Sequence, residues 1–200
     1  MIPRIEEKLE VARIDYPRVL AWLCNHGFTV LYPKRVVNSI YFDNHQMQML
    51  FDAQEGITPR RKVRLRYYGS DSLKSIENVS LEIKESAASG RSKSVWSSVD
   101  IDNALLLGIF DKIYGLCLPV LKISYQREYF KFDNWRVTLD RDIMYEKFDN
   151  NHFGCKSFDP SYVLEIKASI DQDKDLFRNF FDFPRSKFSK YERAFECLGL

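Results

Sequence analysis

The sequence has no hydrophobic run that approaches the roughly 20 apolar residues needed to cross a bilayer. Its N-terminal residues also lack the apolar core of a secretory signal. Charge of one sign does not dominate, because 30 lysines and arginines nearly balance 28 aspartates and glutamates. That balance excludes the bulk basic charge of a protein that coats nucleic acid. We therefore expect a cytoplasmic protein with no membrane segment in this chain, in which any anion site comes from local clustering of cations.

Cysteine is scarce, and the four cysteines, Cys24, Cys117, Cys155 and Cys197, are widely separated. The chain has no C-x-x-C motif and no histidine at ligand spacing from them, so neither a disulfide framework nor a zinc site is indicated. We expect reduced thiols in the core. Repeats, low-complexity tracts and linkers are absent as well, which predicts a single domain over residues 1–200.

One segment, residues 61–69, alternates cations with apolar residues. Successive strand residues point to opposite faces, so Lys62, Arg64 and Arg66 form a row of positive charge on one face. The opposite row is apolar and consists of Val63, Leu65 and Tyr67. Like charges on one face repel one another. That cost is easiest to explain if the face binds a polyanion.

Eight segments have the period-two alternation of strands: 6–12, 37–42, 62–68, 79–84, 94–99, 121–130, 135–143 and 162–168. Helical spacing occurs between them at 15–25, 102–115, 172–181 and 189–197, and the small residues of 85–91 indicate a flexible loop. The pattern predicts the α+β class, with an eight-stranded antiparallel β-barrel and helices packed on its outside.

Ionisable side chains share one strand face in further segments. These are Glu6 with Lys8, Glu82 with Lys84, Glu165 with Lys167, and Arg136 with Thr138 and Asp140. A solvated face with ordinary Glu–Lys ladders explains any one segment, because antiparallel sheets usually have one such face. Recurrence in five segments favours the alternative, in which the sheet closes with its charged faces around a tunnel.

A tunnel lined by cations and a few acids suits phosphate chemistry. Phosphate oxygens bind arginine forks and lysine charges, and phosphoryl transfer depends mainly on positioning and electrostatic stabilisation. Isolated carboxylates among cations are best explained as ligands of Mg²⁺ or Mn²⁺. A nucleic-acid groove would instead place aromatic residues among the cations. Here the aromatic residues Tyr67, Trp135 and Tyr129 mostly alternate against the charged rows, so no nucleic-acid partner is expected.

Eight motifs together resemble the CYTH-like triphosphate tunnel metalloenzymes, and among them the VTC-type polyphosphate polymerase domain. In order they are Arg4 to Lys8 (R-x-E-x-K), Val37 to Asp43 (V-x-S-x-Y-F-D), Lys62 to Gly69 (K-x-R-x-R-x-Y-G), Leu81 to Lys84 (L-E-x-K), Ser124 to Arg127 (S-Y-x-R), Arg136 to Arg141 (R-x-T-x-D-R), Val163 to Lys167 (a second L-E-x-K) and Lys187 to Tyr191 (K-F-S-K-Y). No single motif is specific, but eight in one order are. One departure is Ser92-Lys93-Ser94, where the family usually has a fuller K-x-R.

The resemblance implies site residues by position. A catalytic set of phosphate-holding cations would comprise Arg64, Arg66, Lys84, Arg127 and Arg136. Further phosphate-binding cations would be Lys8, Lys62, Lys93, Lys167, Lys187 and Lys190. The metal would be held by Glu165, with Glu6 and Asp140 as additional candidates. For Lys187 and Lys190, plain solvation at a helix start is the alternative, although an anion at that helix end would offset the helix dipole.

The resemblance implies transfer of a phosphoryl group from a nucleoside triphosphate to a growing inorganic polyphosphate chain, with Mn²⁺ or Mg²⁺. Nucleoside triphosphate and polyphosphate would be its partners. Two other functions stay open: an inorganic triphosphatase, in which water replaces the acceptor, and a non-catalytic module that binds polyphosphate or an inositol polyphosphate. Arg64→Ala and Arg66→Ala are expected to abolish activity with little loss of fold, because neither side chain belongs to the apolar face.

Overall fold

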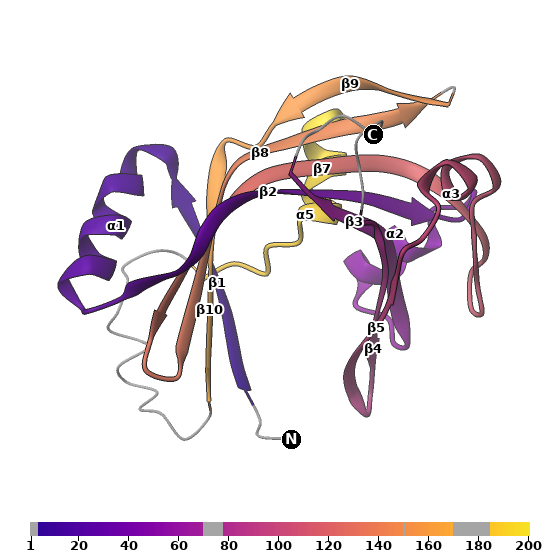
Figure 1. Ribbon diagram of the computed structural model, residues 1–200. Coiled ribbons are helices and arrows are strands. Elements are labelled where there is room, and N and C mark those ends of the chain that lie inside the picture. The colour runs from indigo at the N-terminus through magenta and orange to yellow at the C-terminus, as the bar shows by residue number, and fades with distance from the viewer. Residues whose placement is uncertain (1–3, 70–77, 150, 170–184) are drawn as a thin grey trace. The chain divides into compact units, whose positions relative to one another are not determined.

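The computed structural model describes residues 4–69, 78–149, 151–169 and 185–200 (Figure 1). The strands are β1 (Arg4–Ala12), β2 (Thr29–Asp43), β3 (Arg60–Tyr68), β4 (Ser80–Ala87), β5 (Gly90–Ser97), β6 (Ile109–Asp111), β7 (Gly115–Phe132), β8 (Trp135–Asp149), β9 (His152–Phe158) and β10 (Ser161–Ser169). The helices are η1 (Arg13–Asp15), α1 (Tyr16–Asn25), α2 (Gln48–Glu55), α3 (Ile101–Leu107) and α5 (Lys190–Leu198). The helix expected at 172–181 lies outside the described residues.

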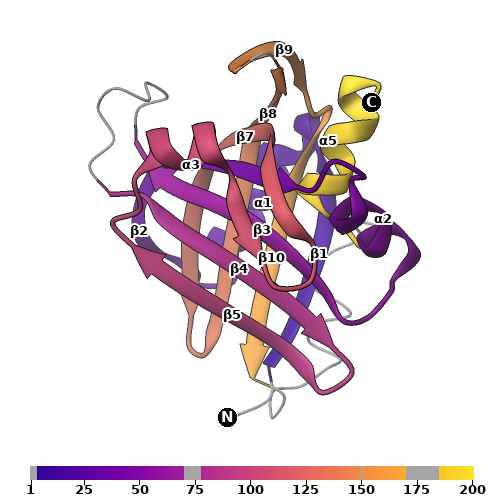
Figure 2. The ribbon, with the colours of Figure 1, turned by 90° about the vertical axis from the view of Figure 1, so that its right-hand side faces the viewer.

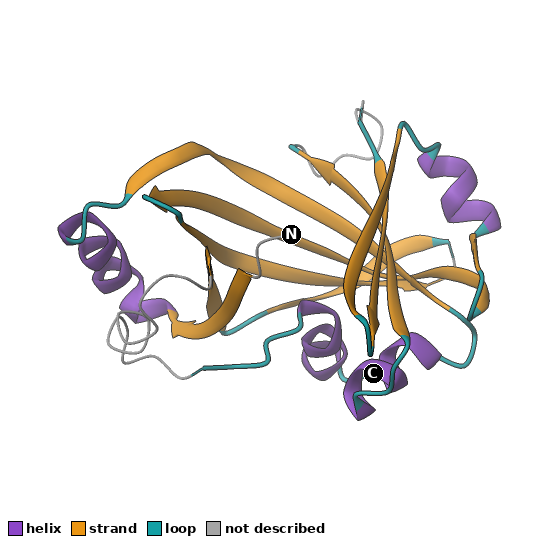
Figure 3. Cartoon of the chain, turned by 90° about the horizontal axis from the view of Figure 1, so that it is seen from below, coloured by secondary structure: helices purple, strands orange, loops and turns teal. Residues whose placement is uncertain are grey.

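Strands prevail over helices (Figure 3), and they are hydrogen-bonded in the order β1-β10-β8-β7-β2-β3-β4-β5. β6 pairs with β7, and β9 pairs with β8. Each of the eight segments predicted as strands falls on one of the eight strands of this path. The fold class, an antiparallel sheet of many strands with a few helices, is confirmed. Closure of the sheet into a barrel stays a prediction. No helix among the described residues is long and apolar enough to span a membrane.

The chain divides into two compact units. Unit 1 comprises Met1–Arg35, Tyr125–Ile143 and Asp159–Phe188, and unit 2 comprises Val36–Ser124, Met144–Phe158 and Ser189–Leu200. The strands β2, β7 and β8 run through both units, because each unit takes part of their length. The single domain expected from the sequence stays a prediction.

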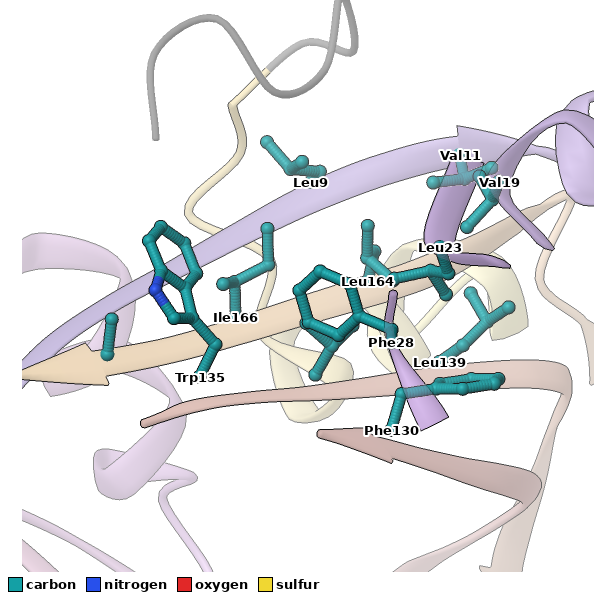
Figure 4. Close-up of a cluster of buried hydrophobic side chains, with 12 residues drawn as sticks. Leu9, Val11, Val19, Leu23, Phe28, Phe130, Trp135, Leu139, Leu164 and Ile166 are labelled. Atoms are coloured by element: carbon teal, nitrogen blue, oxygen red, sulfur yellow. The ribbon is translucent and has the colours of Figure 1, made fainter. Parts of the chain in front are cut away.

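The core of unit 1 forms between α1 and the strands (Figure 4). Pro17 lies in the first turn of α1, where its missing N–H costs no hydrogen bond. Val19 and Leu23, one turn apart on that helix, are 0% and 1% exposed. They belong to the same cluster as the buried side chains Leu9, Val11, Phe28, Phe130, Trp135, Val137, Leu139, Leu164, Ile166 and Ala168. The helix predicted over 15–25 is thus confirmed, and its apolar stripe covers one face of the strands.

Unit 2 has its own core, to which β3 contributes its apolar row. Val63, Leu65 and Tyr67 are all 0% exposed and pack with side chains that include Ile40 and Met49. The period-two prediction for this strand is therefore confirmed. Burial of one face leaves the opposite, cationic face to the functional site.

The predicted helix at 102–115 is too long. Helix α3 ends at Leu107 and the chain continues as β6. Gly108 separates them with φ 78° and ψ −172°, a conformation that is essentially restricted to glycine. A Cβ at this position would lie 2.5 Å from the carbonyl oxygen of Cys117. The apolar residues after Gly108 thus follow the strand partner, and their helical spacing is coincidental.

Two other segments differ from expectation. The loop predicted at 85–91 is mostly paired strand, since β4 reaches Ala87 and β5 begins at Gly90. Helix α2 was not predicted, because its start depends on a residue outside the helix. Asp43 accepts hydrogen bonds from the backbone N–H groups of Met49 and Leu50 at 3.0 Å each. These are N–H groups that a helix start otherwise leaves unsatisfied.

The cysteines are free thiols, but the expectation that all four lie in the core is wrong. Cys117 is buried, whereas Cys24 and Cys155 are exposed and Cys197 is intermediate. Cys24 lies on the solvent side of α1, next to the buried Leu23. Apolar spacing alone could not separate these two adjacent positions.

We predict that Gly108→Ala lowers the free energy of unfolding by roughly 2 to 4 kcal/mol, because backbone strain adds to the clash with Cys117. Gly56→Ala is the matched control: Gly56 also has a positive φ, 72°, but no atom lies within 4 Å of its added Cβ. That control should cost only about 1 kcal/mol. Denaturant unfolding of both variants measures the difference. Equal losses would contradict the close approach at Gly108.

Candidate functional site

The charged face of unit 2 is built by three neighbouring strands, which Figure 2 shows side by side. In β3 and β4 the directly opposed residues are Arg64 with Glu82 and Lys62 with Lys84. Lys84 in turn opposes Lys93 on β5. Opposed residues of an antiparallel pair share a face, so register brings these ionisable groups together. We call this set, with Arg66, the unit 2 charged face.

Glu82 pairs with three cations of this face, Arg64, Arg66 and Lys93. Its side chain accepts from Arg64 Nε at 2.8 Å and Nη2 at 2.5 Å, and from Lys93 Nζ at 2.6 Å. Arg66 Nη1 lies 3.8 Å from the same carboxylate. Burial alone would raise the pKa of Glu82, but Arg64 and Arg66 outweigh it and lower that pKa to about 2. Glu82 is therefore a permanent anion that fixes the direction of Arg64.

Cations outnumber acids on this face, and the phenol of Tyr41 lies beside them. Arg64 Nη1 donates to the Tyr41 hydroxyl at 2.9 Å, and Tyr41 is only 7% exposed. Burial raises the pKa of a phenol, yet Arg64, Arg66 and Lys84 together lower the pKa of Tyr41 from 10.0 to about 7. A group that is easier to ionise when buried reports a strongly positive potential. The site can therefore stabilise an anion.

Lys62, at the end of this row, interacts with the last helix. Lys62 Nζ donates to Ser189 Oγ at 2.8 Å and lies 2.8 Å from Glu192 Oε1. Ser189 is also the N-cap of α5 and accepts from the backbone N–H of Glu192. The predicted phosphate ligand Lys62 is thus positioned by α5. Of the two lysines at the start of this segment, Lys187 is exposed and Lys190 is partly buried.

The charged face of unit 1 comes from β1, β10, β8 and β7. Lys8 opposes Glu165, and Glu6 opposes Lys167. On β8, the other strand paired with β10, Thr138 opposes Glu165 and Arg136 opposes Lys167. The face, which we call the unit 1 charged face, consists of Glu6, Lys8, Arg127, Arg136, Asp140, Glu165 and Lys167. Its predicted members are all brought to one side of the strands, although the side chains of Arg136 and Glu6 are exposed.

Arg127 and Asp140 form a bidentate pair. Arg127 Nε lies 2.5 Å from Asp140 Oδ1, and its Nη2 lies 2.7 Å from Oδ2. Asp140 is 1% exposed. Burial would lower the pKa of Arg127, but Asp140 outweighs it and keeps the guanidinium charged. Because both carboxylate oxygens accept from Arg127, this geometry favours a positioning role for Asp140 over metal ligation.

Glu165 is a stronger candidate than Asp140 for a metal ligand. Lys167 Nζ lies 3.0 Å from Oε1, and Arg127 Nη2 lies 3.8 Å from Oε2. Burial opposes ionisation of Glu165, but Lys167, a hydrogen bond with Glu6, Lys8 and Arg127 outweigh it and lower its pKa. No group of three or more histidine, cysteine or acidic side chains within the described ranges is placed to hold a metal. The neighbouring carboxylates of Glu165 and Glu6 fit Mg²⁺ or Mn²⁺ when phosphate oxygens complete the coordination shell of the ion.

Three residues that contact the cations of the unit 2 charged face were given no role by the sequence patterns. Glu82 was assigned to the face but given no role, and its position opposite Arg64 was not available from the sequence. Tyr41 belongs to β2, whose motif showed nothing unusual, and Glu192 comes from a helix 130 residues beyond Lys62. The one signal that could have drawn attention to Glu82 is that few acidic residues share the charged strand faces with so many cations.

The sequence profile described as VTC domain matches residues 3–115 and 108–199. No curated protein matches the chain. A solved structure of a candidate adenylyl cyclase from Hippeastrum is described as revealing a dominant triphosphatase activity. It is similar with a TM-score of 0.57 at 14% identity, over 97% of this chain and 96% of that one. A candidate adenylate cyclase from Vibrio parahaemolyticus has a TM-score of 0.55 at 15% identity over 96% and 97%.

A protein from Pyrococcus horikoshii OT3 is similar too, with a TM-score of 0.51 at 15% identity, over 99% of this chain and 91% of that one. Identities this low show a shared fold and nothing about activity. All three structures nevertheless cover nearly the whole chain. The similarity therefore extends to the strands that bear both charged faces.

We predict that one of the 11 tyrosines titrates near pH 7, and that Tyr41→Phe removes this transition. Near-ultraviolet absorbance of tyrosinate measures it, and the exposed Tyr68 provides the control variant Tyr68→Phe, which should keep it. The pKa of folded Tyr41 lies below its unfolded value, so the unfolded state binds more protons between about pH 7 and 10. Stability from this group should rise with pH through that window and be lost below it. A wild type without a low-pH tyrosine would contradict the positive potential.

Proposed function

Since this chain belongs to the VTC domain family, we propose that it is a metal-dependent enzyme that transfers the terminal phosphoryl group of a nucleoside triphosphate to a growing inorganic polyphosphate chain. The observation that carries the proposal is the cluster of cations that strand register brings to the unit 2 charged face, and the lowered pKa of the buried Tyr41 phenol agrees with its positive potential. A face that stabilises one buried anion to this extent is suited to phosphate oxygens.

The cations suit phosphoryl transfer because they are held in place before substrate arrives. Transfer of a phosphoryl group depends mainly on positioning and on stabilising charge spread over its oxygens. Arg64 is oriented by Glu82 and Tyr41, and Arg66 donates to Ser39 Oγ at 3.3 and 3.2 Å. Fixed donors need no reorganisation during the reaction, which is the main source of electrostatic stabilisation in enzymes. Arg64 and Arg66 would therefore contact the reacting phosphate, with Arg64 oriented by Glu82 and Arg66 by Ser39.

A divalent cation would be held by Glu165, assisted by Glu6, together with phosphate oxygens. When bound, the ion would offset the charge on those oxygens and polarise them. Lys167, Lys8 and Arg127 keep the Glu165 carboxyl ionised, which is the form that a metal requires. Arg127, fixed by Asp140, would orient a phosphate beside it. The ion would be Mn²⁺ or Mg²⁺.

An inorganic triphosphatase is the second candidate. It is favoured by the similarity to the Hippeastrum structure, whose description reports a dominant triphosphatase activity for that protein. The two activities share the same phosphate-binding groups and differ in the acceptor, which is a polyphosphate chain in one and water in the other. A non-catalytic binding module would keep the cations and dispense with the metal.

We predict that purified protein incubated with ATP and Mn²⁺ makes polyphosphate that can be resolved on a gel, and that Glu165→Gln abolishes it. The amide keeps the shape of the side chain but removes the charge that a divalent ion needs. Released phosphate is measured in the same reaction. Phosphate without polymer would make the protein a triphosphatase, and tripolyphosphate binding without either product would leave a binding module.

Replacing Arg64 and Arg66 should separate phosphate binding from stability. For Arg64 this differs from the sequence-based expectation that its replacement causes little loss of fold. Arg64→Ala leaves the buried Glu82 without its main partner, so we predict a loss of roughly 3 kcal/mol in the free energy of unfolding. Arg66→Ala should change stability little, because its contact with Glu82 is 3.8 Å.

The same Arg66→Ala variant should weaken tripolyphosphate binding at least about tenfold, since charge-assisted hydrogen bonds to phosphate are lost. Calorimetric titration and denaturant unfolding check the two quantities. The matched control is Lys112→Ala, which removes an exposed cation of unit 2 outside this face. If Arg66→Ala bound tripolyphosphate like the control, the face would not be a phosphate site.

A further inference from the structure

An aromatic and cationic group lies in unit 1 next to the phosphate-binding candidate Arg127. The guanidinium carbon of Arg35 lies 5.4 Å from the centroid of the Tyr32 ring and 5.2 Å from that of Tyr129. The two tyrosine rings meet edge to face, with centroids 5.6 Å apart and an angle of 83°. Tyr32 and Arg35 come from the first half of β2, and Tyr129 comes from the second half of β7.

Strand alternation places Tyr129 on the charged face, which corrects the expectation that this residue alternates against the cations. Tyr129 follows Arg127 by two residues, so both side chains point to the same side of β7, about 7 Å apart along the strand. The residues between and beyond them face the other way: Phe130 belongs to the hydrophobic core, and Glu128 accepts from the hydroxyl of Tyr16 on α1. A stacking group and a fixed guanidinium therefore adjoin on one face.

Two members of this group are exposed to solvent. Tyr129 is 6% exposed, but Tyr32 is 43% exposed, and Arg35 is exposed too. An exposed tyrosine ring beside a planar guanidinium offers two flat surfaces of the kind on which nucleobases stack. A plain phosphate site has no need of such surfaces. A ligand that carries both a base and phosphates uses them together with Arg127.

We propose that Tyr32, Arg35 and Tyr129 form a stacking site for the base of a nucleoside triphosphate whose phosphates bind at Arg127. The inference rests on the proposed function and deepens it. Stacking reads the area of a flat ring and not its hydrogen-bonding edge. Purine nucleotides should therefore be preferred to pyrimidine nucleotides, with little discrimination between adenine and guanine.

The test compares ATP with inorganic tripolyphosphate, which has the phosphates but no base. Tyr32→Ala should weaken ATP binding about 5- to 100-fold and leave tripolyphosphate binding unchanged, because it removes a stacking surface and no charge. Tyr32→Phe should restore ATP binding. Arg35→Lys keeps the charge but loses the planar surface, so it should weaken ATP binding and spare tripolyphosphate. Calorimetric titration gives both affinities for each variant.

Phe132→Ala is the matched control, because Phe132 is a similarly exposed aromatic residue, at 42%, in the same stretch of β7. It should alter neither affinity. If Tyr32→Ala weakened both ligands equally, or neither, the stacking site would be refuted while the proposed function survived. A wild type that bound neither ligand would instead contradict the proposed function itself. Thermal unfolding of each variant ensures that affinities are compared between folded proteins.

Discussion

A buried carboxylate that pairs with several cations is the interaction on which the unit 2 charged face depends. Lys62, Arg64 and Arg66 share one face of β3, and without a counter-charge their repulsion would oppose strand pairing. Glu82, directly opposite Arg64 on β4, supplies that charge and brings Lys93 of β5 into the same group. Breaking a buried pair of this kind typically costs about 3 to 5 kcal/mol, far more than a surface ion pair contributes. Stability and the orientation of Arg64 thus have one common cause.

Unit 1 uses the same arrangement. Arg127 on β7 is held by Asp140 on β8, as Arg64 on β3 is held by Glu82 on β4. In both, an arginine fork on one strand meets a buried carboxylate on the neighbouring strand, and burial makes the pairing rigid. The acid differs in what surrounds it: Glu82 also binds Lys93, whereas both carboxylate oxygens of Asp140 accept from Arg127. Each carboxylate orients an arginine, and Glu165 is the carboxylate that we propose as the metal ligand.

The apolar faces make this polar chemistry possible. Val63, Leu65 and Tyr67 are buried on one side of β3, so the strand is fixed by packing that does not involve its cations. In unit 1, α1 covers the apolar side of the strands in the same way. Because the hydrophobic contacts hold the backbone, the opposite face can carry an excess of positive charge. That excess lowers the pKa of Tyr41 even though burial acts against it.

The sequence by itself determined which residues share a face, because alternation along a strand follows from backbone geometry. It also predicted the eight strands of the sheet path, helix α1 and the cations of both charged faces. Only the tertiary structure decided which charged groups meet, since Arg64 and Glu82 are brought together by register between strands, and Lys62 meets Glu192 through a helix distant in sequence. The end of α3 and the start of α2 were likewise decided by contacts with Cys117 and Asp43, which local propensity does not contain.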